Sequence, residues 1–147
     1  MSTAELLPLE TTRKVHDTCL CLHLQRAARA VARRFDDALR PHGLTNGQFS
    51  LLMALNRAEP PAISSVATLL AMDRTTLTAA LKPLQRRGLV TIVVDAADRR
   101  SRRLVLTHAG HAVLIAAVPA WQRQHAAIDR NLGPDPNRLR TDLRSLA

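Results

Sequence analysis

Apolar residues recur at spacings of three and four along the first third of the chain, which is the period of an amphipathic helix. They are Leu20, Leu24, Ala27, Val31, Phe35 and Leu39. The pattern predicts one helix of about seven turns over residues 13–39. Pro41 and Gly43 are expected to end it. Residues 1–12, which mix polar residues with a proline, are expected to form a loose arm.

Three shorter helices are expected between residues 45 and 88. Thr45 and Gln48 form a capping box at the start of the first helix. Ser64, after a short extended piece, can cap the second helix, and Asp73 can cap the third. The apolar residues expected to face the core are Phe49, Leu52, Leu55, Val66, Leu69, Leu70, Leu77, Leu81 and Leu84.

A proline interrupts the pattern of the third of these helices. Pro83 lacks a backbone donor and crowds the preceding turn, which costs about 3 kcal/mol in an unperturbed helix interior. We therefore expect a bend near Ala79, downstream of the first turns of the helix.

The pattern then changes to β-branched residues. Residues 89–94 and 104–106 predict the two strands of a hairpin around a charged loop. Thr107 is expected to cap a long helix with an apolar stripe at alternating spacings of four and three, which suits packing on another helix. The stripe consists of Leu114, Val118, Trp121, His125, Ile128 and Leu132.

The chain ends in a short helix. Gly133 is expected to end the long helix, and Asp135 to cap the last one, with Pro136 at its first position. Its inward residues are expected to be Leu139, Leu143 and Leu146.

The positive charge is concentrated in one part of the chain. Of the formal net charge of +9, six units fall within residues 74–103, where eight basic residues face Asp95 and Asp98. The basic residues are Arg74, Lys82, Arg86, Arg87, Arg99, Arg100, Arg102 and Arg103. A helix after a tight turn and before a cationic ribbon suits duplex DNA, because the major groove admits a helix and the phosphates attract the ribbon.

The composition disfavours several other classes of protein. Two Phe, one Trp and no Tyr argue against a platform that stacks single-stranded bases. The longest apolar run, residues 112–120, is shorter than the ~18 residues of a membrane span, and no signal peptide is evident, so we expect a cytoplasmic protein without a membrane partner. No arrangement of catalytic residues stands out, so neither an enzyme nor a cofactor is expected.

The predicted elements follow one another in the order helix, helix, turn, helix, hairpin, long helix and short helix, and three segments carry the most specific part of this order. They are LTNGQFSLLMAL, VATLLAMDRTTLTAALKPLQRRGLV and DAADRRSRRLVLTHAG. In this order they resemble the MarR family of winged helix-turn-helix transcription regulators. The resemblance implies a mainly α fold with a small β-hairpin wing, in which a winged helix-turn-helix domain carries flanking dimerisation helices.

The resemblance also implies how the chain is organised. Residues 1–12 would be a flexible N-terminal arm, residues 13–44 and 107–147 a helical dimerisation region, and residues 45–106 the DNA-binding domain. Family members are homodimers, so the expected partners are double-stranded DNA with a pseudo-palindromic operator and a second copy of the chain. The expected effect is repression, released by a small molecule.

The candidate DNA contacts lie at two helix starts and in the wing. They are Ser64, Ser65, Arg74, Thr75, Thr76, Thr78, Lys82, Arg86, Asp98, Arg99, Arg100 and Arg102. An arginine can fork onto a guanine edge, whereas a threonine can offer its hydroxyl to a base or phosphate, or its methyl to thymine. A solvated helix start is the alternative for residues 74–78. Arg86 and Arg87 are expected to touch the backbone or acidic neighbours.

The wing loop matches the DxxDRR signature of the family at residues 95–100. The resemblance implies that one arginine enters the minor groove while Asp98 pairs with another and fixes the loop. Which arginine takes which role stays open, as does the choice between DNA contact and a solvated strand face for Arg102 and Arg103.

Family members usually hold a small molecule between the first, second and fifth helices. The corresponding residues are His16, Cys19, His23, Phe49, Met53, Val113 and Trp121. Because this set is mostly apolar, a hydrophobic or aromatic anion is the expected effector, with plain core packing as the alternative.

A thiol offers a different signal. Leu20-Cys21-Leu22 resembles the segment that carries the reactive cysteine in the peroxide-sensing branch of the family, but the tyrosines that serve that thiolate are missing here. Redox sensing through Cys21 is therefore weighed against a buried, inert thiol, and a non-specific architectural DNA-binding protein is the remaining alternative. His16, Cys19 and His23 would share one helix face but lack a fourth ligand, so no metal is expected.

Overall fold

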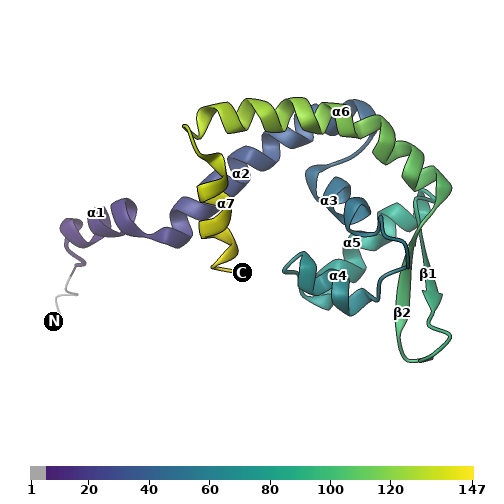
Figure 1. The fold of residues 1–147 in the computed structure, drawn as a ribbon. Coiled ribbons are helices and arrows are strands. Elements are labelled where there is room, and N and C mark those ends of the chain that lie inside the picture. Colours follow the sequence, from purple (N-terminus) through teal and green to yellow (C-terminus); the bar gives the residue numbers. More distant parts are fainter. Residues whose placement is uncertain (1–5) are drawn as a thin grey trace. The chain divides into compact units, whose positions relative to one another are not determined.

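The computed structural model describes residues 6–147, and the chain divides into two compact units, residues 1–34 and 35–147. The first unit contains α1 (Leu9–Thr18) and most of α2 (Leu20–Leu39). The elements of the second unit after α2 are the 3₁₀ helix η1 (Arg40–His42), α3 (Asn46–Ala54), α4 (Ile63–Leu69), α5 (Arg74–Arg86), β1 (Val90–Val94), β2 (Arg102–Leu106), α6 (His108–Asn131) and α7 (Pro136–Arg144) (Figure 1). The mainly helical fold with one antiparallel hairpin is confirmed.

The first unit departs from the single helix that the spacing predicts. The chain breaks at Cys19, whose ψ of 106° is extended, so the predicted helix is two helices. Thr18 Oγ1 donates to the Lys14 carbonyl at 2.6 Å and competes there with the helical ladder, as threonine side chains can. The prediction of a loose arm is wrong for residues 9–12, which are helical. Pro8 stands just before the helix, where a backbone amide would have no hydrogen-bond partner within the helix, so a proline costs nothing there. Residues 1–5 of that arm lie outside the described residues.

Leucines from α3, α5 and the hairpin form the centre of the second unit. Leu52, Leu77, Leu81, Leu84 and Leu104 have no exposed surface, and burying each such side chain contributes about 1.5–3 kcal/mol to folding. The expected core positions Phe49, Leu55 and Val66 are also confirmed as buried. Leu77, Leu81 and Leu84 are four and three residues apart, so they hold α5 in place by one face only.

Four leucines that were expected inside lie at the surface. Leu69 at the end of α4 is 59% exposed, and Leu139, Leu143 and Leu146 are between 40% and 57% exposed. Leu70 is only partly buried. Helical period identifies an apolar face, but it does not say whether the same chain covers that face.

The helix starts in the second unit follow the predicted caps, with one exception. Thr45 and Gln48 form the capping box, and Asp73 Oδ1 accepts from the Thr76 amide at 2.8 Å. The exception is Ser64, which is already inside α4; Ala62 is the N-cap and forms an isolated bridge with Arg103. Tertiary pairing with the hairpin therefore overrides the local capping signal.

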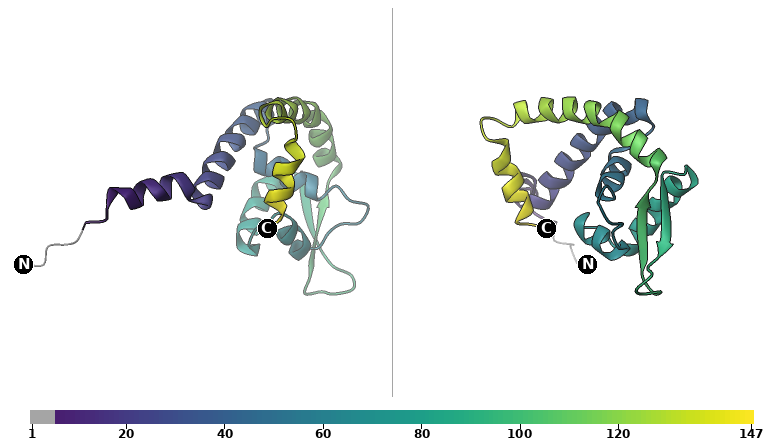
Figure 2. Two further views of the ribbon diagram at one scale, coloured as in Figure 1. Left: turned by 60° about the vertical axis from the view of Figure 1, so that its left-hand side comes forward. Right: turned by 45° about the vertical axis from the view of Figure 1, so that its right-hand side comes forward.

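The end of α5, the base of the hairpin and the start of α6 are joined by Thr107. Its side chain caps α6 through the Gly110 amide at 3.0 Å and donates to the Gly88 carbonyl at 2.7 Å, while its amide donates to the Leu89 carbonyl at 3.1 Å. Val90 pairs with Leu106 at this end of the hairpin. Both views in Figure 2 show the hairpin extending from this joint beyond α4 and α5. The joint fixes the wing relative to α5.

The stripe of α6 is only partly covered within this chain. Leu114 is buried, the middle of the stripe is half-buried and Leu132 is 40% exposed, so its packing on another helix stays a prediction. No helix within residues 6–147 combines the length and the apolar character that crossing a membrane requires.

The last helix is tied to α6 by an ionic cluster. Arg140 Nη2 contacts Asp129 Oδ1 and lies 3.3 Å from His125 Nε2, and His125 Nδ1 lies 3.6 Å from Asp129 Oδ2. No residue of α7 is buried. This ionic cluster therefore connects α7 to α6.

We expect Arg140→Ala to loosen α7 without unfolding the second unit. A partly exposed ion pair contributes about 1 kcal/mol at most, so amide exchange in α7 should become roughly fivefold faster. Nuclear magnetic resonance would measure it, with Arg138→Ala on the exposed side of α7 as the matched control. Equal exchange in the two variants would show that other contacts hold α7.

Candidate nucleic-acid interface

The exposed face of α5 forms a groove. Leu77, Leu81 and Leu84 occupy the buried face of α5, whereas Arg74, Thr75 and Thr78 are exposed beside it. The groove has a volume of about 400 Å³ and is lined by Arg74, Thr75, Thr78, Ala79 and Lys82. Four of the five lining residues are candidate DNA contacts, and the structure brings them together.

The threonines of α5 differ in what their hydroxyls do. Thr76 Oγ1 donates to Asp73 Oδ2 and Thr78 Oγ1 donates to the Arg74 carbonyl, both at 2.8 Å. The Thr75 hydroxyl makes no side-chain hydrogen bond within the part of the chain that the structure describes. Three threonines that look equivalent in the sequence therefore present different groups at the surface.

The start of α5 is stabilised by Asp73. Hydrogen bonds from the Thr76 amide and then the Thr76 hydroxyl hold the pKa of this carboxyl below its usual range. α5 continues through Pro83 to Arg86 as one helix, and the bend near Ala79 stays a prediction.

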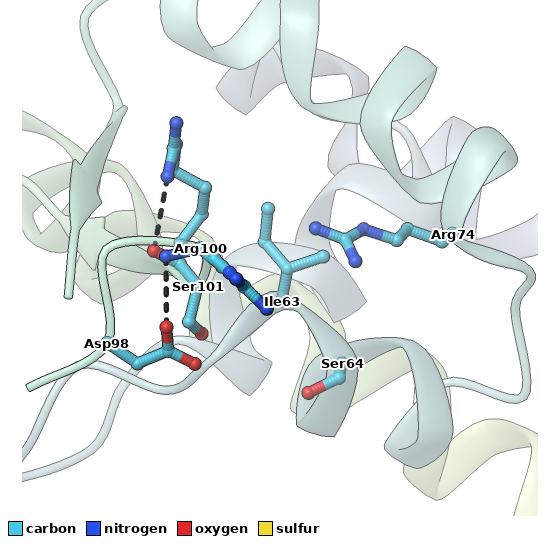
Figure 3. A pocket seen from close by; sticks show the side chains of 7 residues that line it. Ile63, Ser64, Arg74, Asp98, Arg100 and Ser101 are labelled. Carbon is cyan, nitrogen blue, oxygen red and sulfur yellow. Dashed lines mark hydrogen bonds between the residues drawn. The ribbon is translucent and has the colours of Figure 1, made fainter.

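A second hollow lies where α4, α5 and the wing meet. It has a volume of about 210 Å³, and its lining residues are Ile63, Ser64, Arg74, Asp98, Arg100, Ser101 and Arg102. Figure 3 shows the Arg74 guanidinium reaching from α5 toward Ile63 and the wing loop. Three arginines face one aspartate here, so the hollow attracts an anion.

Arg74 lines both the groove of α5 and this hollow. Ser64 lines the hollow, but Ser65 does not, and the Ser65 hydroxyl donates to the Ala62 carbonyl at 2.9 Å. The sequence placed both serines at the helix start and gave no signal to distinguish them.

The aspartate that pairs with a wing arginine is Asp95 and not Asp98. Arg103 Nε donates to Asp95 Oδ2 at 3.0 Å, and Arg103 Nη1 donates to the Pro60 carbonyl at 2.7 Å. Asp98 Oδ1 instead accepts from the backbone amide of Arg100 at 3.0 Å and closes a turn. The expected pairing of Asp98 is thus wrong, because a short turn uses its carboxylate locally. Asp95 and Arg103 are close diagonal neighbours across the two strands, a relation that the register would have indicated.

The remaining arginines divide into braced and unbraced ones. Arg102 Nη1 donates to the Arg99 carbonyl at 3.0 Å and braces the wing loop from inside. The side chains of Arg99 and Arg100 are exposed and make no hydrogen bond or ion pair with residues 6–147. Two guanidinium groups at the wing tip are therefore available to an external partner.

Two further basic residues follow α5. Arg87 Nη1 donates to the Gly43 carbonyl at 2.8 Å and so ties the end of α5 to the turn after η1. Arg86 is exposed and has no side-chain partner among the described residues. Arg87 has a structural contact, and Arg86 is open to an external one.

The wing should lose order in acid because of Asp95. The Ala97 amide and then Arg103 hold the pKa of this carboxyl below its usual range. A lowered pKa in the folded state means that the stabilisation is complete above the ordinary aspartate pKa of about 3.9 and is lost as the pH falls through the lower folded value. We expect nuclear relaxation of residues 95–101 to report increased motion below about pH 4.

The variant Asp95→Asn should show that motion already at neutral pH and a weaker dependence on acid. Asp142→Asn on the exposed side of α7 is the control that removes a carboxylate elsewhere. A wing that stays equally ordered in Asp95→Asn would contradict the bracing role of this pair.

The expected effector residues fall in both units. His16, Cys19 and His23 belong to the first unit, and the other members belong to the second, so their convergence stays a prediction. In the second unit the rings of Phe49 and Trp121 stack at 6.0 Å, and Trp121 stacks on His125 at 4.8 Å. Met53 and Val113, the remaining second-unit members, are 36% exposed and partly buried respectively.

The two cysteines are free. Cys21 is exposed, so the expectation of a buried thiol is wrong. Gln25 Nε2 lies 3.4 Å from its sulfur. The break at Cys19 interrupts the helix face that His16, Cys19 and His23 were expected to share. Within residues 6–147 no group of three His, Cys, Asp or Glu side chains is placed to hold a metal ion.

Comparison with known proteins decides the family. A model of the MarR family matches residues 42–101, which contain α3, α4, α5, β1 and the whole wing loop. The crystal structure of the transcriptional regulator MosR from M. tuberculosis in complex with DNA superposes with a TM-score of 0.81 at 40% identity, over 88% of this chain and 93% of that one. The chain belongs to the MarR family.

Other MarR-type relatives agree with this assignment. The HTH-type transcriptional regulator SarZ of Staphylococcus haemolyticus is 31% identical over 91 residues, which are 62% of each protein. The repressor CouR bound to a 23-mer DNA duplex superposes with a TM-score of 0.77 at 28% identity, over 97% of this chain and 98% of that one. CouR from Rhodococcus jostii RHA1 bound to p-coumaroyl-CoA gives a TM-score of 0.72 at 25% identity, over 84% and 87%.

The matches to the curated relatives are partial. The aligned segments span 62%, 48% and 55% of the length of the first three relatives. The chain therefore matches between about half and about three fifths of the length of these relatives.

Proposed function

We propose that this chain is a transcriptional regulator that binds double-stranded DNA through α5 and the wing, and that it is not an enzyme. The observation that carries the proposal is the position of Arg74, which lines both the groove of α5 and the cationic hollow beside the wing. A helix that fits the major groove and a ribbon that reaches the adjacent backbone meet at this residue. MosR and CouR have each been crystallised with DNA.

The DNA contacts follow from the groups that the described chain leaves unpaired. Arg74 forks onto a guanine edge, and Lys82 and Arg86 neutralise phosphates along α5. Arg99 or Arg100 enters the minor groove, while Arg102 and Asp98 hold the loop that carries them. Ser64 and Ser65 lie near the backbone at the start of α4. Thr75 is the threonine with a hydroxyl open to a base or a phosphate.

The active form is a homodimer on a pseudo-palindromic operator. Leu139, Leu143 and Leu146 share one exposed face of the C-terminal segment, and a second copy would bury it. Light scattering of the purified protein would test this, and a monomer at micromolar concentration would contradict it. Such a regulator acts in the cytoplasm, where it represses a gene by occupying its operator.

A small hydrophobic or aromatic anion releases the repressor. The half-buried ring of Trp121, which stacks on the buried ring of Phe49, supplies an aromatic surface, and CouR is a relative that has been crystallised with an aromatic acyl-CoA. Release would be a shift between two populations of the dimer that differ in their half-site spacing.

Oxidation of Cys21 is the second candidate signal, favoured by the exposure of its thiol. If this thiol is the sensor, then peroxide abolishes DNA binding of the native protein but not of Cys21→Ser. If the two proteins respond alike, the thiol is not the sensor.

The deciding experiment measures binding of the purified protein to duplex from its own upstream region, with random duplex as competitor, over a series of salt concentrations. A preference of about a thousandfold or more supports a specific regulator. Equal binding to both duplexes, with a steep salt dependence, would indicate a non-specific architectural protein instead.

A further inference from the structure

The groove of α5 contains a threonine whose hydroxyl is already hydrogen-bonded within the helix. Thr78 lies near the middle of this groove, between Arg74 and Lys82. A threonine hydroxyl carries one proton. Thr78 Oγ1 donates that proton to the Arg74 carbonyl at 2.8 Å, so the hydroxyl cannot donate to a base while this bond lasts. The Cγ2 methyl is the other group that the side chain carries.

Ala79 extends the same apolar surface. It is exposed and lines the groove next to Thr78. Thr75 lies one turn before them and has a hydroxyl without a side-chain hydrogen bond among the described residues. The centre of the groove is therefore apolar, while its polar groups lie around this centre.

In the major groove one base offers an apolar partner. Thymine carries a C5 methyl there, whereas the other bases present only hydrogen-bond donors and acceptors or a bare C5 edge. Building on the proposed binding of α5 to duplex DNA, we infer that Thr78 Cγ2 and Ala79 Cβ read a thymine of each half-site by contact with its methyl group. Thr78 then acts as an apolar side chain, although its residue type suggests hydrogen bonding.

The test removes methyl groups from both sides of the contact. A duplex that the protein selects from a randomised library is resynthesised with deoxyuridine in place of each thymine in turn. Burial of one methyl group corresponds to about fourfold in affinity, so one or two substitutions per half-site should weaken binding by about that factor. Thr78→Ser, which keeps the hydroxyl and loses the methyl, should weaken binding to the thymine duplex by a similar factor.

Coupling between the two deletions identifies the contact. In Thr78→Ser the deoxyuridine substitution should cost less than in the native protein, whereas Thr78→Val, which keeps a methyl group, should bind the selected duplex almost as well as the native protein. Thr141→Ser is the matched control, because Thr141 lies on α7 and its hydroxyl likewise donates to the carbonyl four residues earlier, that of Asn137, at 3.1 Å. Circular dichroism confirms that the variants are folded.

The outcomes separate this inference from the proposed function. Weak binding by Thr78→Val together with full binding by Thr78→Ser would show a hydrogen bond from the hydroxyl. This result would overturn methyl recognition and leave specific DNA binding intact. Uniform tolerance of deoxyuridine by the native protein would do the same. If no sequence is selected from the library, specific DNA binding fails and methyl recognition fails with it.

Discussion

Arg74→Ala is expected to reduce the preference for operator over random duplex by about 1–3 kcal/mol per half-site, or roughly 5- to 150-fold. Arg74 is exposed at the first position of α5, and its guanidinium has no partner among the described residues. It lines both the groove of α5 and the hollow beside the wing. A guanine edge offers two acceptors that match the two donors of a guanidinium. Fluorescence anisotropy with labelled operator and random duplexes measures the preference.

The control for Arg74→Ala is Arg130→Ala, which removes the same charge near the far end of α6. It should leave the preference unchanged, because a single distant charge changes only the general attraction to DNA. If Arg74→Ala weakens binding to both duplexes by the same factor, then Arg74 contacts phosphate and does not read a base.

Gly110→Ala is expected to destabilise the second unit by about 3 kcal/mol, the upper range for overpacking a close contact. A Cβ at Gly110 would overlap the carbonyl oxygen of Leu89 and come within 2.6 Å of Leu106 Cδ1. The Leu89 carbonyl accepts from the Thr107 amide, so moving it disturbs the joint that connects α5, the wing and α6. Urea unfolding followed by circular dichroism measures the loss.

A second glycine provides the matched control for Gly110→Ala. Gly47 lies in the first turn of α3, and a Cβ there would meet no atom within 4 Å. Gly47→Ala should therefore leave stability unchanged or raise it by up to about 1 kcal/mol, because alanine restricts the unfolded chain. Native stability in Gly110→Ala would show that α6 does not pack closely on the base of the wing in solution.

Local signals in the sequence gave correct predictions where the responsible atoms lie within one or two turns. The capping box at Thr45, the cap at Asp73 and the cap at Thr107 each join a side chain to an amide three residues away. The leucines of α5 recur at the helical period, so their burial was predictable as well. These interactions form wherever the chain becomes helical.

The sequence failed where a contact joins distant segments. Arg103 reaches the Pro60 carbonyl, 43 residues away, and Arg87 reaches the Gly43 carbonyl, 44 residues away. No local pattern distinguishes these two arginines from Arg99 and Arg100, which are exposed and unbraced. The same reason explains Asp98, whose carboxylate serves a turn while Asp95 pairs across the strands.

Patterns in the sequence were sufficient to predict the elements from α3 to α7, the caps at Thr45, Asp73 and Thr107, the cationic segment and the family. Periodicity, capping and charge are properties of neighbouring residues, and they persist in any conformation that forms the same elements. The tertiary structure alone decided which arginines brace the wing, which threonine keeps an unpaired hydroxyl, and that Arg74 lines both hollows. These depend on which groups meet after folding, because a side chain that finds a partner within the chain is no longer available to DNA.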